Sequence, residues 1–435
     1  MDLVVPAGDA LDHALAVAGV RLGPGDQVFG PGGAPVEPGT AAAELREGGL
    51  YAIASARSTA TSDGRSAKPH TGVRLLPWGL VAAAVTAAVV VFASDTAALR
   101  WSTAVVIGVA ALVSTRVVAS RPAAAAEALE IFPSMLLGAI AGVLGAPRGG
   151  TGVRGELWDT MTACALGCAG VALVAVLLSA FARARAVRAG AATAALIASI
   201  AAFAAAASPL IGWGLREYFI VSAAVSVLMI RALPALLVTV DDGYSIDYGR
   251  FMSLRWTVRG RVPRYIERVD GSDVRELVAV TEFRLRTAIV LCSVLAVPGI
   301  ALAVLPLLTG NTVERIGAGA FLCLSLAALM LVSRRTVAPM LKRPQRLAAL
   351  AGAVGAAVLL AMAAGATTGW LLPAAGAALL AGVSVGAGTI ALQRGARSLG
   401  WSRVGDIVEA IAVAIVLPAG LLAAGAIDVL RGVLS

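Results

Sequence analysis

Long runs of apolar residues, separated by shorter polar stretches, fill most of this chain. Most runs approach the ~20 residues that a helix needs to cross the ~30 Å hydrocarbon core of a bilayer. Only a backbone that satisfies its own hydrogen bonds is tolerated in that core, which favours helices. The pattern therefore predicts a mostly α, polytopic membrane protein with about 11 transmembrane helices, at residues 75–93, 101–119, 131–147, 158–181, 189–213, 218–240, 287–307, 316–333, 347–366, 371–391 and 407–424.

Composition and charge agree with a membrane protein and predict its orientation. The chain is 59% hydrophobic and 14% charged, which is outside the range of soluble domains. If the N-terminus is cytoplasmic, all but six of the 35 Lys and Arg residues lie in cytoplasmic segments. This distribution predicts a multi-pass protein of the cell membrane with an extracytoplasmic C-terminus. Because the basic residues are spread over several loops, nucleic-acid binding is not expected. The six exceptions are Arg100, Arg148, Arg154, Arg216, Arg315 and Arg431.

Residues 1–56 have the pattern of a small soluble domain. Asp2–Pro6 reads as a strand, a helical stretch with Leu11 and Leu15 on one face follows, and Leu50–Ala54 reads as a last strand after several tight turns. This order is the second half of a ubiquitin-like β-grasp, in which the first hairpin strand is missing. We expect an incomplete domain, with either a late encoded start or support from a partner. A loosely folded tail is the alternative.

The remaining segments follow from polarity and periodicity. Residues 57–73 are small and polar, as in a flexible linker. Residues 74–240 hold transmembrane helices 1–6, and 287–424 hold helices 7–11, followed by an extracytoplasmic tail at 425–435. Between the two sets, residues 241–286 form a charged, amphipathic cytosolic loop. Its arginines predict either docking to acidic groups of a cytosolic partner or binding to anionic lipid headgroups; they are Arg259, Arg261, Arg264 and Arg268.

Small residues four positions apart predict close helix packing. Gly138 and Gly142 form one such pair, and Gly382 and Gly386 form another. Helix backbones can approach closely at such pairs. The contact can lie between subunits, as in a dimer, or between two helices of one chain, and the pattern does not decide between them.

The chemistry of catalysis, metal binding and ion coupling is scarce. The two histidines, His13 and His70, precede the membrane region, and the cysteines Cys164, Cys168, Cys292 and Cys323 lie within spans, where thiols behave as small hydrophobic groups. We expect no enzyme activity, no metal and no cofactor. Two ionisable residues are unusual for their places in spans, Arg231 and Glu409, and an interfacial position is the favoured explanation for Glu409.

The whole arrangement resembles the EccD family, an integral membrane component of type VII (ESX) secretion systems of actinobacteria. The residues that carry the resemblance are FGPGGAPVEPGTAAAELREGGLYAIAS at 29–55 and RALPALLVTV at 231–240, together with the order of soluble domain, linker, six spans, charged loop and five spans. The resemblance implies a non-enzymatic scaffold. It would dimerise around a lipid-lined vestibule, and its cytosolic parts would brace an FtsK/SpoIIIE-type secretion ATPase beside other membrane subunits.

Two other functions compete with this interpretation. A secondary transporter or permease for a small solute accounts for eleven spans and could use Glu409, but it leaves the N-terminal domain and the charged loop unexplained. An intramembrane enzyme such as an acyltransferase needs a histidine or paired carboxylates at membrane depth, and the sequence has none.

Overall fold

The computed structural model describes most of the chain beyond residue 70 and short pieces before it. The described residues are 11, 13, 15, 26–29, 35–37, 39–40, 52–55, 71–92, 96–121, 130–149, 151–237, 271–335, 339–363, 399–427 and 429. The chain divides into two compact units, Met1–Val73 and Arg74–Ser435. The predicted strand Asp2–Pro6 and the predicted span 371–391 lie outside the described residues.

The first unit contains a small antiparallel sheet. Its strands β1 (Asp26–Phe29), β2 (Pro35–Val36) and β3 (Ala52–Ser55) are arranged in the order β2-β1-β3. The central strand places Val28 opposite Val36 on one side and Ile53 on the other. Val28 is buried together with Leu11 and Leu15, two residues in helical conformation, so both pack against the sheet.

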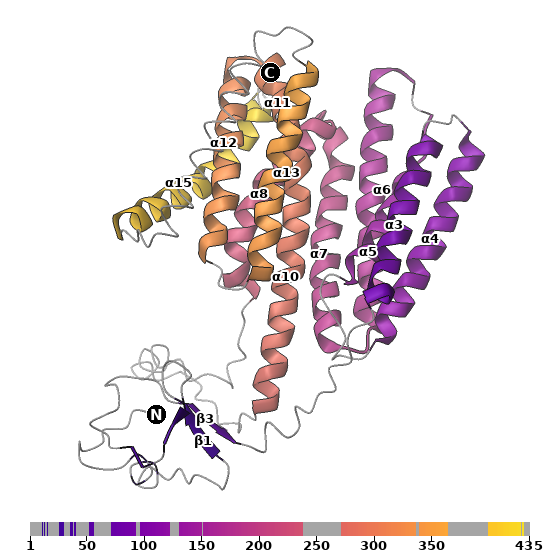
Figure 1. Ribbon diagram of the computed structural model, residues 1–435. Coiled ribbons are helices and arrows are strands. Elements are labelled where there is room, and N and C mark those ends of the chain that lie inside the picture. Colours follow the sequence, from indigo (N-terminus) through magenta and orange to yellow (C-terminus); the bar gives the residue numbers. More distant parts are fainter. Residues whose placement is uncertain are drawn as a thin grey trace, which may run out of the picture. The chain divides into compact units, whose positions relative to one another are not determined.

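The second unit is entirely helical in the part that the structure describes (Figure 1). Eight of its helices are long and apolar enough to cross a membrane, and two shorter apolar helices lie at Pro77–Val91 and Phe132–Leu144. The elements are α3 (Thr71–Phe92), α4 (Ala97–Ser120), α5 (Phe132–Leu144), α6 (Gly152–Phe181), α7 (Arg185–Ala207), η4 (Ser208–Ile211), α8 (Leu215–Leu237), α10 (Gly271–Leu302), α11 (Val304–Thr309), α12 (Thr312–Arg335), α13 (Pro339–Ala363) and α15 (Leu399–Ala423).

These helices coincide with ten of the eleven spans expected from hydropathy. The third is only 13 residues long, about 20 Å, because α5 begins at Phe132, beside Pro133, and ends at Leu144, before Gly145. The fifth span ends where the chain turns at Gly212, whose φ of 75° is readily adopted by glycine. The last helix begins earlier than the expected 407, at Leu399.

The helices bury two large apolar clusters. One is formed mainly by α3, α4, α5, α6 and α7, and the other by α8, α10, α12, α13 and α15. Figure 1 shows these groups on opposite sides of the helical unit, with α7 and α10 packed together between them. At this junction Gly190 lies against Phe283 and Thr287, leaving no room for a side chain.

Helix α10 is central to the second group because it packs against α7, α8 and α13. It has 32 residues, which corresponds to about 48 Å. This length exceeds the ~30 Å hydrocarbon core, so its charged N-terminal part extends beyond it. The expected cytosolic helix at 272–286 and the expected span at 287–307, as far as Leu302, thus share one continuous helix with no break at 286; the rest of the span continues into α11.

Candidate functional site

The two unusual ionisable residues of the spans form an ion pair with each other. Arg231 lies in the last two turns of α8, and Glu409 lies near the middle of α15. The Nε atom of Arg231 is 3.2 Å from Oε1 of Glu409, whose side chain is only 3% exposed. A carboxylate buried at this depth needs such a partner because desolvation of an isolated charge is costly. The pair therefore joins α8 to α15.

A second pair lies between α4 and α5, at the other side of the helical unit. Arg121 directly follows α4, Glu130 precedes α5, and Nη1 of Arg121 is 2.6 Å from Oε2 of Glu130. Their side chains are 20% and 15% exposed. The backbone N–H of Arg183 donates to the carbonyl of Ala119, which places the end of α6 at this same end of the bundle.

A third pair connects α7 with the extended part of α10. Nη1 of Arg185 donates to Oε1 of Glu276 over 3.1 Å, and both side chains are well exposed. An exposed pair of this kind contributes at most about 1 kcal/mol. Its position matters more than its strength, because it attaches the first residue of α7 to the part of α10 nearest the charged loop.

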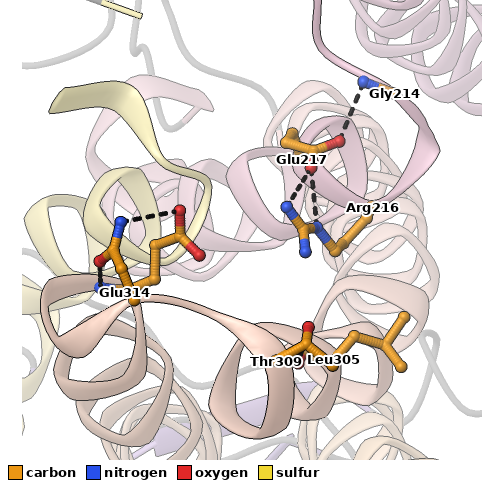
Figure 2. Close-up of polar contacts among 7 residues, drawn as sticks. Gly214, Arg216, Glu217, Leu305, Thr309 and Glu314 are labelled. Atoms are coloured by element: carbon orange, nitrogen blue, oxygen red, sulfur yellow. Dashed lines mark hydrogen bonds and ion pairs between the residues drawn. The ribbon is translucent and has the colours of Figure 1, made fainter. Parts of the chain in front are cut away.

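Side-chain oxygens at the opposite end of the bundle cap helices (Figure 2). Glu217 accepts the backbone N–H of Gly214 at 2.9 Å and the Nε–H of Arg216 at 2.7 Å. Oδ1 of Asn311 accepts the backbone N–H of Glu314 at 2.9 Å, and Nδ2 of Asn311 donates to Oε1 of Glu314 at 3.3 Å. Acceptors at helix N-termini satisfy N–H groups that have no partner within the helix. These groups therefore have a structural role.

The predicted helix-packing residues Gly138 and Gly142 lie on α5 against α6 of the same chain. A Cβ at Gly138 would be 2.7 Å from the carbonyl oxygen of Gly170, and a Cβ at Gly142 would overlap the backbone of Leu166. These glycines therefore make an intrachain contact in the structure. The other predicted residues lie outside the described part of the chain: Gly382, Gly386, Arg259, Arg261, Arg264 and Arg268.

No metal-binding group is present among the residues that the structure describes: none of their His, Cys, Asp and Glu side chains gather in threes or more. The four cysteines are free thiols. Cys164 and Cys168 lie on α6, and Tyr218 of α8 packs beside Cys164 in a small apolar cluster. The hydroxyl of Tyr218 donates to the carbonyl of Ala201, which satisfies it without a ligand.

Two features were not expected from the sequence. The pair Arg121–Glu130 was missed because both residues lie at predicted span ends, where a solvated position explains a charge. The partnership of Arg231 with Glu409 was missed because the residues are far apart in the chain. The sequence held one signal for this partnership: Arg231 and Glu409 were the two ionisable residues with unusual positions in their spans. Two such residues of opposite charge can neutralise each other.

A scan against models of known protein families gives no match, and no curated protein matches the sequence. Solved structures do match. A chain described as protomer 1 of the ESX-3 core complex superposes with a TM-score of 0.55 at 17% identity, covering 98% of this chain and 96% of that one. A chain of the MycP5-free ESX-5 inner membrane complex, State II, superposes with a TM-score of 0.51 at 16% identity, covering 87% of this chain and 90% of that one.

This chain has the fold of these ESX components. The match covers nearly the full length, so both the N-terminal unit and the helical unit contribute to the similarity. It agrees with the resemblance to the EccD family that the sequence carries. At 16–17% identity, the similarity describes the fold and leaves the partners and the activity to be argued separately.

Proposed function

We propose that this chain is the EccD-type membrane subunit of a type VII (ESX) secretion complex. The observation that carries the proposal is the match of the fold over almost the whole of both chains. A fold shared over one domain would leave function open, because folds host many functions. Here the match covers 98% of this chain and 96% of that one, so it spans the N-terminal unit and the helical unit together.

In this proposal the first unit is a ubiquitin-like cytosolic domain that braces a secretion ATPase. Support comes from the sheet, in which β1 pairs antiparallel with β3 and is covered by Leu11 and Leu15. A β-grasp has the same helix-on-sheet arrangement in its second half. Among the residues that the structure describes, Leu11, Leu15 and Val28 are buried in one apolar cluster, and contact with a partner would stabilise a domain this small.

The charged cytosolic loop is the second proposed contact with the ATPase. Its arginines would meet acidic groups of that partner. Helix α10 supports a mechanical link, since one helix continues from the end of this loop into the middle of the second helix group. A load on the loop would therefore reach the membrane helices through a stiff element.

The helices would hold other polypeptides in the membrane and pair with a second copy of the chain around a vestibule. The cytoplasmic side would carry the N-terminus and the basic loops, and the C-terminus would lie outside. The chain itself would perform no chemistry, and energy would come from the ATPase. The burial of Glu409 against Arg231 fits this role, because the carboxylate has a structural partner within the chain.

Affinity purification from native membranes tests the proposal. The full chain, tagged at its C-terminus and extracted in a mild detergent, is expected to bring an FtsK/SpoIIIE-type ATPase and sister membrane subunits with it. Replacing Arg261 and Arg264 by Gln should release the ATPase but not the membrane subunits. The matched control replaces Lys342 and Arg343, two basic residues at the start of α13, and should release neither. Recovery of a lone monomer would refute the proposal.

A secondary transporter remains the second candidate because Glu409 is a buried carboxylate. In a transporter that couples through this group, Glu409→Gln should abolish solute uptake by reconstituted vesicles while the protein stays folded. In a scaffold the same variant should change stability alone. Uptake that depends on Glu409 would favour the transporter.

A further inference from the structure

A cavity of about 400 Å³ opens on the surface formed by α3, α4 and the start of α5. Its long wall is one face of α4, where Val106, Val109, Val113 and Val117 recur at intervals of three and four residues. All four valines are about half exposed or more, so they face whatever surrounds the helices. The volume is in the range of small-ligand sites.

One end of this cavity is polar. Its lining includes Arg121 and Glu130, whose ion pair is described above, and Trp78 of α3 lies in the same lining. Tryptophan is enriched at the level of lipid headgroups because its ring is apolar and its N–H is polar. Basic residues at helix ends also lie there. The polar end therefore has the composition of a membrane interface, and the valine face has that of the hydrocarbon core.

The pair has capacity for further partners. A carboxylate has about four acceptor sites in total, and the contact of Oε2 of Glu130 with Nη1 of Arg121 at 2.6 Å uses one of them. The guanidinium of Arg121 has five N–H groups in total. A ligand that supplies both a donor and an anionic acceptor would satisfy the carboxylate and the guanidinium together.

We propose that this cavity binds a phospholipid with a phosphoethanolamine headgroup. The phosphate would accept hydrogen bonds from Arg121, and the primary ammonium would donate to Glu130. A purely anionic headgroup would meet repulsion from Glu130, and a choline headgroup has no N–H to donate. An apolar helix of another protein would cover the ion pair without adding a partner, which would cost desolvation energy.

The geometry along α4 suits one acyl chain. From Arg121 back to Val106 the helix spans about 22 Å, which is more than the ~15 Å thickness of one leaflet of the hydrocarbon core. An acyl chain held by its headgroup at Arg121 would therefore lie along the valine face towards the bilayer centre. This site is independent of the proposed role in secretion, since it needs only the membrane.

Lipid titration of the purified full chain, followed by native mass spectrometry, tests the site. The probes are dioleoyl lipids with ethanolamine, choline and glycerol headgroups. The wild type should bind the ethanolamine lipid about tenfold more tightly than the other two, as expected for one hydrogen bond to a charged group. The double variant Arg121→Met/Glu130→Met leaves no unpaired charge and should bind all three lipids equally. Arg185→Gln breaks the exposed pair elsewhere and should keep the selectivity.

A second variant tests the acyl-chain wall without touching the charges. Val113→Phe fills the cavity and should weaken the binding of all three lipids. Val105→Phe, which is on α4 but outside the cavity lining, should leave their binding unchanged. Elution volume and melting temperature monitor the fold of each variant. Selectivity that survives Arg121→Met/Glu130→Met would overturn the proposal. The proposal would also be overturned if the wild type bound the glycerol lipid more tightly than the ethanolamine lipid. It would equally be overturned if the cavity held a polypeptide in place of lipid and Val113→Phe released that polypeptide.

Discussion

Substituting Gly142 by alanine should separate α5 from α6. The added Cβ would lie 2.6 Å from the carbonyl carbon of Leu166 and 3.0 Å from the backbone nitrogen of Gly167. Carbon atoms in contact are normally 3.5–4.0 Å apart, and backbone atoms cannot rotate away, so the helices must move apart by about 1 Å. Overpacking of this kind costs about 1–3 kcal/mol. Alanine recovers roughly 0.5–1 kcal/mol through its helix propensity, which leaves a net loss of up to about 2.5 kcal/mol relative to the wild type.

Gly108→Ala is the matched control. This glycine lies on α4, faces α5, and its added Cβ would be 3.9 Å from Cβ of Ala141, an ordinary contact. The control should therefore be as stable as the wild type or slightly more stable. The measurement is the apparent melting temperature of the full chain in one detergent, followed by size-exclusion chromatography. We expect Gly142→Ala to melt a few degrees below Gly108→Ala.

The same experiment distinguishes intrachain packing from a subunit contact. If Gly142 acts within the chain, the melting temperature falls and the oligomeric state of the remaining folded protein is unchanged. The reasoning is refuted if Gly142→Ala melts no lower than Gly108→Ala. A loss of dimer at an unchanged melting temperature would instead place Gly142 between subunits.

Three further predictions concern other contacts. Arg231→Gln should destabilise the chain by about 1–3 kcal/mol, because it removes one partner from the buried carboxylate of Glu409. Adding Glu409→Gln should recover part of this loss. Urea unfolding in detergent measures both variants, and additive effects would count against the pairing. Gly190→Ala should lower the melting temperature because its Cβ would strike the ring of Phe283, and Phe283→Leu should restore it; absence of rescue would contradict the contact. Val28→Asp should unfold the N-terminal unit alone, so limited proteolysis should remove that unit and leave the helices intact. If the variant and the wild type were cleaved at the same rate, the N-terminal unit would not be a folded unit that depends on Val28.

Much of the helical unit could be predicted from local sequence. Ten of the expected spans coincide with helices in the described part of the chain, because crossing a bilayer requires a long apolar run, and that requirement is met within a single segment. Helix ends were less predictable. Leu399 begins α15 ahead of the apolar run, and Gly271 begins α10 far ahead of its own, because a helix can continue into water on polar residues.

The sequence by itself determined where the chain is apolar enough to enter a membrane, how its basic residues are distributed among the segments, and that histidine is absent from the expected spans. Only the tertiary structure decided which helix faces which. It places Gly142 against Leu166, pairs Arg231 with Glu409, and opens the cavity between Trp78 and the valine face of α4. The physical reason is range: hydrophobicity and helix formation act over neighbouring residues, whereas packing and ion pairing depend on segments that only folding brings together.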